Sequence, residues 1–121
     1  NNYFECIRPH LDPNSVIMCG DLLQLIQEDQ FLIFENRYDL CFLFRMLPLL
    51  ERLRKNSVAA LLPKISSQWL IVSISLKSLA KEQDISVKQR ALLRELLDHS
   101  YLEIIKRFSF PREEFVILKI I

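Results

Sequence analysis

A single glycine, Gly20, occurs among the 121 residues of this chain. Glycine adopts positive φ without steric cost, and the tight turns of antiparallel hairpins commonly use it. Half of the residues are hydrophobic and 26% are charged, which is typical of a globular chain that buries its own core. With so few glycines available for hairpins, we predict an all-α fold. Antiparallel helix pairs would stack as a short helical repeat or bundle, in one domain over residues 1–121.

Helical periodicity runs along the first two thirds of the chain. Apolar residues recur at intervals of three and four within 12–26, 31–55 and 65–79, which predicts helices. Asp12 and Pro13 are residue types preferred at a helix start.

Local signals refine these expected helices. Pro48 should kink or divide the second one, because a helix interior cannot use a residue without an N–H group. A further short helix is expected over 57–62. Residues 72–76 also alternate as they would in a strand, but the longer register and the lack of flanking glycines favour helix.

The last third carries a capping-box pattern, Ser-x-x-Gln over 86–89, which predicts the start of a helix that reaches Phe108. Pro111 then opens a final helix. Glu113 and Glu114 would lie in its first turn, where carboxylates complement the positive end of the helix dipole.

The spacing of these elements resembles a known repeat architecture. Pro13, Pro63 and Pro111 each lie near an expected helix start, 50 and 48 residues apart, and LLERL over 49–53 is echoed by LLREL over 92–96. HEAT and armadillo units repeat every ~40–47 residues. Residues 12–121 therefore resemble a HEAT or armadillo-type solenoid.

A second resemblance rests on one motif. The segment ENRYDL over 35–40 is followed by Phe42, Phe44 and Leu47, and later by LLD over 96–98. This arrangement is similar to the helical repeats in cullin N-terminal arms. Both resemblances imply rigid scaffolding and partner binding.

Charge and cysteine content indicate the environment. A net charge of +1, from 16 basic and 15 acidic residues, provides no global field to attract nucleic acid or an anionic membrane. Cys6, Cys19 and Cys41 lack metal-ligand spacing, which favours free thiols in a reducing compartment. No apolar stretch reaches the ~18–20 residues that span a bilayer. We expect an intracellular protein, in cytoplasm or nucleus. The missing initiator Met and the apolar end at 117–121 suggest a fragment of a larger protein, or a domain whose last helix packs inward.

The residues that catalysis would need are missing or poorly spaced. Cys6 and His10 form one pair without a second pair to complete a four-ligand metal site. On a helix, Asp98 and His99 would point about 100° apart and could not form a relay. One glycine cannot build a nucleophile elbow or a phosphate-cradling loop. We therefore predict no metal, no cofactor and no catalytic residues in a protein that is not an enzyme.

An excess of apolar residues suggests a binding role. Segment 31–50 is apolar on nearly every side, more than a two-layer domain needs to bury. We predict a protein–protein interaction or scaffolding module that binds another protein, or a neighbouring part of the same chain, through this surface and the terminal helix. The predicted contact residues are Phe31, Phe34, Phe42, Phe44, Leu47, Phe115 and Leu118.

Nucleic-acid binding stays open as the alternative. Basic residues gather at expected helix ends, and stacked helices could align them along phosphates without sequence readout. Acidic neighbours such as Glu51 and Glu103 interleave with these cations, which weakens the field. The candidate phosphate contacts are Arg52, Arg54, Lys55, Lys106 and Arg107.

Overall fold

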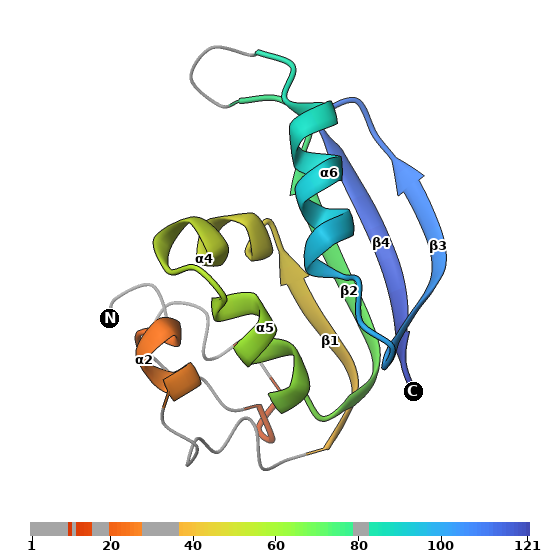
Figure 1. Ribbon diagram of the computed structural model, residues 1–121. Coiled ribbons are helices and arrows are strands. Elements are labelled where there is room, and N and C mark those ends of the chain that lie inside the picture. The colour runs from red at the N-terminus through yellow and green to blue at the C-terminus, as the bar shows by residue number, and fades with distance from the viewer. Residues whose placement is uncertain (1–9, 11, 16–19, 28–36, 79–82) are drawn as a thin grey trace.

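The computed structural model describes residues 10, 12–15, 20–27, 37–78 and 83–121. These residues form a four-stranded sheet with helices packed on one face (Figure 1). In chain order the elements are α2 (Leu22–Gln27), β1 (Tyr38–Phe44), α4 (Leu47–Leu53), α5 (Ser57–Leu61), the 3-10 helix η2 (Leu62–Lys64), β2 (Ser67–Ser75), α6 (Ser86–Leu96), β3 (Leu102–Ser109) and β4 (Glu113–Ile120). The predicted all-α fold is wrong, and so is the stack of antiparallel helix pairs.

The sheet is mixed, with the strand order β1-β2-β4-β3. Strands β1 and β2 run parallel, and Leu43 pairs with Val72. The chain crosses between them through α4, α5 and η2, because parallel strands cannot be joined by a tight hairpin. Strand β4 is antiparallel to both β2 and β3, and β3 and β4 form a hairpin at the other edge.

Strand β1 occupies part of the segment predicted as a long helix. Its apolar residues cover both faces, and such a short apolar run fits a buried strand as well as a helix. Pro48 lies in the first turn of α4, where its missing N–H costs nothing, so it marks the start of that helix and does not kink a longer one.

The helix predicted over 65–79 is also wrong, because β2 occupies most of it. Leu70, Val72 and Ile74 alternate along this strand and are all fully buried on the helix-covered face. The alternation of residues 72–76 was therefore the correct signal.

Helix α6 begins at Ser86 as predicted but ends at Leu96, well before Phe108. Its N-cap residue is Ile85, which makes no side-chain cap, so the capping box is not formed; just ahead of the helix, Asp84 Oδ1 accepts a hydrogen bond from the Ser86 N–H at 2.9 Å. The final helix predicted from Pro111 is β4 instead.

The β3–β4 hairpin closes without glycine. Its turn runs from Phe110 to Arg112, and the Phe110 N–H donates to the Glu113 carbonyl at 2.8 Å. Within the described residues, only Arg45 and Asn56 have positive φ, so this turn needs no left-handed residue. The single glycine of the chain therefore did not exclude an antiparallel sheet.

The remaining helices are short. The helix expected over 57–62 is present as α5, and the Glu51 carboxylate accepts hydrogen bonds from the N–H groups of Asn56 (2.7 Å) and Val58 (3.2 Å) beside its start. Asp12 lies in a turn and does not begin a helix, whereas the Asp21 carboxylate accepts from the Leu23 N–H at the start of α2.

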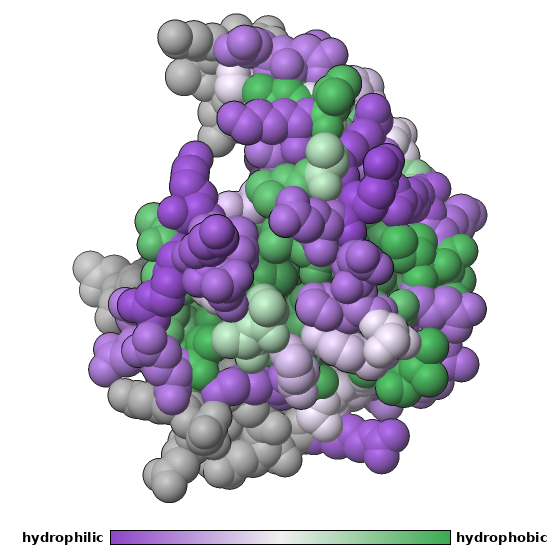
Figure 2. Space-filling view, viewed as in Figure 1, coloured by the Kyte–Doolittle hydropathy of each residue, from purple (hydrophilic) through white to green (hydrophobic). Residues whose placement is uncertain are grey.

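The core lies between the sheet and the helices. Side chains from α4, α5, η2, β2 and β4 are fully buried there: Leu47, Val58, Leu62, Leu70, Val72, Ile74, Val116 and Leu118. On the helix-covered side, hydrophilic side chains dominate the outer surface, and hydrophobic ones show between the helices and along β3 (Figure 2). No helix in the described part of the chain is long and apolar enough to cross a membrane.

Candidate functional site

The end of β1 carries the most unusual backbone of the sheet. Arg45 follows this strand directly, and its φ of 57° lies in the left-handed region. That conformation costs a residue other than glycine about 1–2 kcal/mol. Strained residues of this kind concentrate at functional sites. Ligands of open α/β sheets also bind beyond the carboxyl ends of parallel strands, which is where Arg45 lies.

Hydrogen bonds to β2 hold this backbone in place. The Arg45 N–H donates to the Ser73 carbonyl oxygen at 3.0 Å and to Ser73 Oγ at 3.1 Å. Ser73 is fully buried although it is polar. Its position on β2 therefore fixes where the chain leaves β1.

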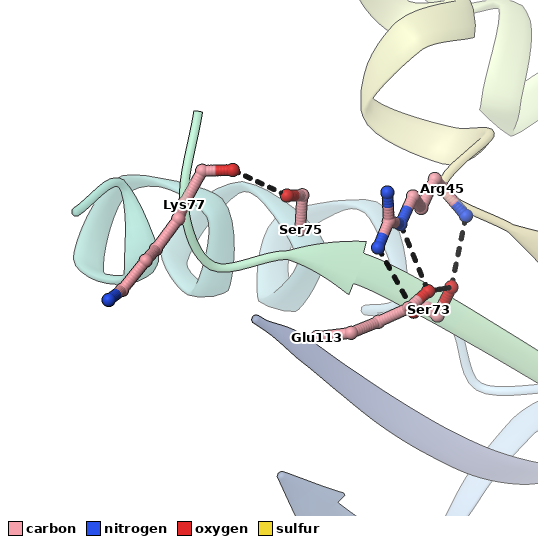
Figure 3. A network of polar contacts seen from close by, with 5 residues as sticks. All are labelled: Arg45, Ser73, Ser75, Lys77 and Glu113. Carbon is pink, nitrogen blue, oxygen red and sulfur yellow. Dashed lines mark hydrogen bonds and ion pairs between the residues drawn. The ribbon is translucent and has the colours of Figure 1, made fainter. Parts of the chain in front are cut away.

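The side chain of Arg45 is held by β4. Its Nε lies 3.1 Å from Glu113 Oε1, and its Nη2 lies 3.2 Å from Glu113 Oε2. Ser73 Oγ donates to the same Oε1 at 2.8 Å, as Figure 3 shows. Arg45, Ser73 and Glu113 thus form one network, here called the Arg45 clamp, that joins three strands.

Two opposing effects act on the Glu113 carboxyl. Partial burial would raise its pKa, but the hydrogen bonds from Arg45 and Ser73, with the charge of Arg45, lower the pKa below its ordinary value. Glu113 is therefore a carboxylate at neutral pH and keeps its attraction for the guanidinium.

The two consecutive glutamates of β4 face opposite ways. Glu113 reaches Arg45 on the face without described helices, whereas Glu114 is buried on the helix-covered face. There its Oε1 accepts from Ser109 Oγ at 2.7 Å and from Nε of Arg90 on α6 at 3.2 Å. The alternation of a strand separates the pair, so they are not a helix-dipole complement as predicted.

An open pocket of about 490 Å³ lies beside the Arg45 clamp. It is lined by Arg45, Phe110, Pro111, Arg112, Glu113 and Phe115. These residues come from the end of β1, the β3–β4 turn and the start of β4. The pocket thus combines two guanidinium side chains with two phenyl rings.

A row of aromatic rings leads to this pocket across the sheet. Phe44, Ser73, Phe115 and Phe108 are register partners in adjacent strands, so they share one face. The Phe44 ring meets Phe115 edge to face at 5.7 Å between centroids, and Phe108 stacks on Phe115 at 5.4 Å. Phe110 contacts both Phe108 and Phe115, at 5.9 and 5.8 Å. We call Phe42, Phe44, Phe108, Phe110 and Phe115 the aromatic face.

Some of the predicted contact residues belong to this face and others do not. Phe42, Phe44 and Phe115 are brought together on it, and Phe42 is 54% exposed. Leu47 and Leu118 are fully buried in the core and cannot contact a partner. Phe31 and Phe34 lie outside the described residues.

The predicted phosphate contacts form no single ridge. Arg52, Arg54 and Lys55 are at the end of α4, on the opposite side of the molecule from β3, which carries Lys106 and Arg107 (Figure 1). Lys106 and Arg107 are consecutive residues of one strand, so they project from opposite faces. Arg54 donates to the Leu23 carbonyl oxygen at 3.3 Å.

The described His, Cys, Asp and Glu side chains form no metal site. Within the ranges that the structure describes, no three His, Cys, Asp or Glu residues are grouped to hold a metal ion. Cys41 is a free thiol on β1, and burial raises its pKa. Cys6 and Cys19 lie outside the described residues.

No protein-family model and no curated protein matches this chain. Solved structures do match it. An rRNA methylase from Escherichia coli is 28% identical with a TM-score of 0.53, over 68% of this chain and 31% of that one. The 16S rRNA methyltransferase RmtF, solved with S-adenosyl-L-homocysteine, is 22% identical with a TM-score of 0.67, over 86% of this chain and 37% of its own. The 16S rRNA methylase ArmA is 20% identical with a TM-score of 0.66, over 99% of this chain and 56% of its own.

These matches correct the functional predictions. The resemblance to HEAT, armadillo and cullin repeats is wrong, because the neighbours share a mixed sheet with helices. The expectation of a scaffolding module that is not an enzyme is contradicted as well, since each of these neighbours is an rRNA methylase or methyltransferase. The chain spans 31–56% of the length of these three structures.

Proposed function

We propose that this chain is part of the catalytic domain of an RNA methyltransferase that uses S-adenosylmethionine and belongs to a longer protein. The observation that carries the proposal is the sheet order β1-β2-β4-β3, with a clamped arginine at the carboxyl end of β1, in a fold shared with rRNA methyltransferases. The E. coli rRNA methylase adds sequence identity of 28% over two thirds of the chain.

These residues alone do not fit the whole cofactor. S-adenosylmethionine supplies an electrophilic sulfonium methyl group when bound, and nucleotide-like cofactors are commonly cradled by glycine-rich loops. The chain has one glycine, and a Cβ added at Gly20 would lie 3.0 Å from Leu25 Cδ1, so this glycine serves close packing. We therefore assign the cofactor cradle to residues outside this chain and the RNA side of the site to the Arg45 clamp.

The open side of the sheet supports a larger domain. No described strand pairs with the outer edge of β1, and Tyr38, Leu40, Phe42 and Phe44 along it are all exposed. Long apolar edge strands invite aggregation, and sheets with parallel strands are generally covered on both faces. In the proposed enzyme, further parts of the same catalytic domain pair with β1 and cover the aromatic face.

Arg45 is suited to bind RNA in such a site. A guanidinium remains charged at all physiological pH values and binds phosphate or carbonyl oxygens through several donors. Glu113 accepts hydrogen bonds from Nε and Nη2 of Arg45, and Arg45 also lines the pocket. The role of the clamp is to orient this cation.

The test is methyl transfer by the full-length protein. It would be incubated with S-adenosylmethionine carrying a labelled methyl group and, separately, with small ribosomal subunits, naked ribosomal RNA and total tRNA. We expect label in one RNA class. A folded protein that labels none of these RNAs, and that labels a protein or a small molecule instead, would overturn the proposal.

A further inference from the structure

We propose that Glu114 is a positioning residue for methyl transfer. Through Arg90 it fixes the start of α6, and with it the chain beyond the carboxyl end of β2, here called the β2–α6 segment (residues 76–78 and 83–85). This inference rests on the proposed function, because it assigns a second wall to the same site. Ligands of open α/β sheets bind beyond the carboxyl ends of parallel strands, and β2 is the parallel neighbour of β1.

Backbone hydrogen bonds connect the β2–α6 segment with the β3–β4 turn and with α6. The Leu76 N–H donates to the Arg112 carbonyl oxygen at 2.9 Å, and the Leu76 carbonyl oxygen accepts from the Ile85 N–H at 3.0 Å. Lys77 and Asp84 pair as an isolated antiparallel bridge. Because Ile85 directly precedes α6, which starts at the end of the sheet where β2 ends (Figure 1), the position of this helix determines where the segment lies.

Glu114 attaches α6 to the start of β4. Its Oε1 accepts hydrogen bonds from Arg90 Nε at 3.2 Å and from Ser109 Oγ at 2.7 Å, so it connects the helix with both strands of the hairpin. The preceding residue on β4 is Glu113, which holds Arg45 on the opposite face. Two consecutive residues therefore fix both walls of the site relative to the same point of the sheet.

Charges of alternating sign continue this attachment into the β2–α6 segment. Hydrogen bonds from Ser86, together with the charges of Lys77 and Arg90, hold the pKa of Asp84 below its ordinary value, so Asp84 is a carboxylate at neutral pH. The order is Glu114, Arg90, Asp84 and Lys77, from β4 to the end of β2. Loss of Glu114 would therefore release Arg90 and loosen the segment that Arg90 attracts.

The burial of Glu114 is poorly explained by stability alone. Its side chain is 8% exposed, yet only Oε1 is hydrogen-bonded, and Oε2 has no hydrogen-bond partner within the described part of the chain. A buried carboxylate loses its hydration, and an ion pair often fails to offset this cost. An apolar side chain of similar size would stabilise the same place as well or better. What the carboxylate adds is a fixed position for α6.

The experiment measures stability and transfer separately in the full-length protein, with the RNA class that the wild type labels. Glu114→Met leaves no buried charge behind, because the Arg90 side chain is 40% exposed and can be hydrated. We expect a thermal midpoint equal to or above that of the wild type, while kcat falls by about tenfold and KM for RNA changes little. Glu95→Met, on the exposed surface of α6, is the matched control and should change none of these quantities.

Variants of the partner test whether the ion pair is responsible. Arg90→Lys keeps a cation for Glu114 Oε1 and should retain most of the wild-type kcat, whereas Arg90→Met should match Glu114→Met. The double variant Arg90→Met with Glu114→Met should be no slower than either single variant, because both substitutions remove the same contact.

Hydrogen exchange provides a readout that does not depend on methyl transfer. In Glu114→Met the amides of residues 84–90 should exchange about tenfold faster although global stability is retained. Unchanged exchange there, or a kcat equal to that of the wild type, would overturn the inference and leave the proposed function intact. A fall in thermal stability that parallels the fall in kcat would also overturn it, since it would show a purely structural role. A folded wild type that transfers no methyl group would overturn the proposed function together with the role of Glu114 in it.

Discussion

Glu113 accepts two hydrogen bonds from the guanidinium of Arg45, to Oε1 from Nε at 3.1 Å and to Oε2 from Nη2 at 3.2 Å, and the two residues are 68 positions apart in the sequence. The Arg45 side chain is 45% exposed, and surface ion pairs contribute only about 0–1 kcal/mol to stability. The pair therefore does more to set the direction of the guanidinium than to stabilise the fold. Ser73 on β2 donates a hydrogen bond to the same Glu113 carboxylate, which further fixes the position of the ion pair.

Substituting Glu113→Gln should separate these two roles. The amide keeps the shape but loses the charge and one acceptor, so the unfolding free energy should fall by less than about 1 kcal/mol. Methyl transfer should fall by more than about tenfold, because Arg45 is no longer fixed. Transfer rates and urea unfolding measure both quantities. Glu95→Gln, on the exposed surface of α6, is the matched control and should change neither. Wild-type rates in Glu113→Gln would show that the clamp has no positioning role.

The lowered pKa of Glu113 predicts how the stability of the fold changes with pH. A carboxyl whose folded-state pKa is depressed contributes stability above its unfolded value, near 4.5, and loses it as the pH falls through the lower folded value. The stability difference between the wild type and Glu113→Gln should therefore be constant at neutral pH and shrink as the pH falls from about 4.5 downward. Unfolding of both proteins across this range provides the measurement. A difference that grows on acidification would contradict the ionised carboxylate.

Two residues with left-handed backbone, Arg45 and Asn56, allow the role of Arg45 in methyl transfer to be compared with that of a second position of the same conformation. Arg45→Gly relieves strain of about 1–2 kcal/mol but removes the ion pair, so stability should change little while transfer is lost. Asn56→Gly changes the other positive-φ position, beside α5, and should leave transfer intact. Equal activity in both variants would show that transfer needs neither the Arg45 guanidinium nor the left-handed backbone at this position.

Leu47 and Leu53 distinguish core from surface within α4. Leu47 is fully buried, and Leu47→Ala should lower the unfolding free energy by about 2–5 kcal/mol. Leu53 is 61% exposed at the other end of the helix, and Leu53→Ala should cost well under about 1 kcal/mol. Denaturant unfolding monitored at Trp69 measures both. A small cost at Leu47 would mean that this side chain faces a partner, as the sequence suggested.

The sequence located the starts of the helices α5 and α6, and Pro48 marked the start of α4, but the strands were assigned to helices. Ser86 and Pro48 each lie at or next to the start of a real helix, because capping and proline effects are local. The strands were missed for a non-local reason. Residues 38–44 pair with 67–75 in parallel, and a short apolar run carries no period that separates such a strand from a buried helix. The glycine argument failed because the 110–112 turn uses Pro111 and ordinary φ values.

The candidate site was almost entirely hidden in the sequence. Arg45, Ser73 and Glu113 are far apart along the chain and meet only when β1, β2 and β4 are aligned. Residues 115–118 form a continuous apolar run, so only the structure shows the alternating burial of β4 that places Glu113 and Glu114 on opposite faces. The aromatic residues Phe42, Phe44 and Phe115 were singled out by their apolar excess, although the helix assigned to them was wrong.

The single-turnover rate of methyl transfer to RNA tests the central claim most directly. It would be measured for the full-length protein, for Arg45→Gln and for Arg52→Gln, whose arginine is exposed on α4. We predict transfer by the wild type, a loss of about a hundredfold or more in Arg45→Gln, and no change in Arg52→Gln. Equal rates in all three proteins, or no transfer by a folded wild type, would contradict an RNA methyltransferase site built around the Arg45 clamp.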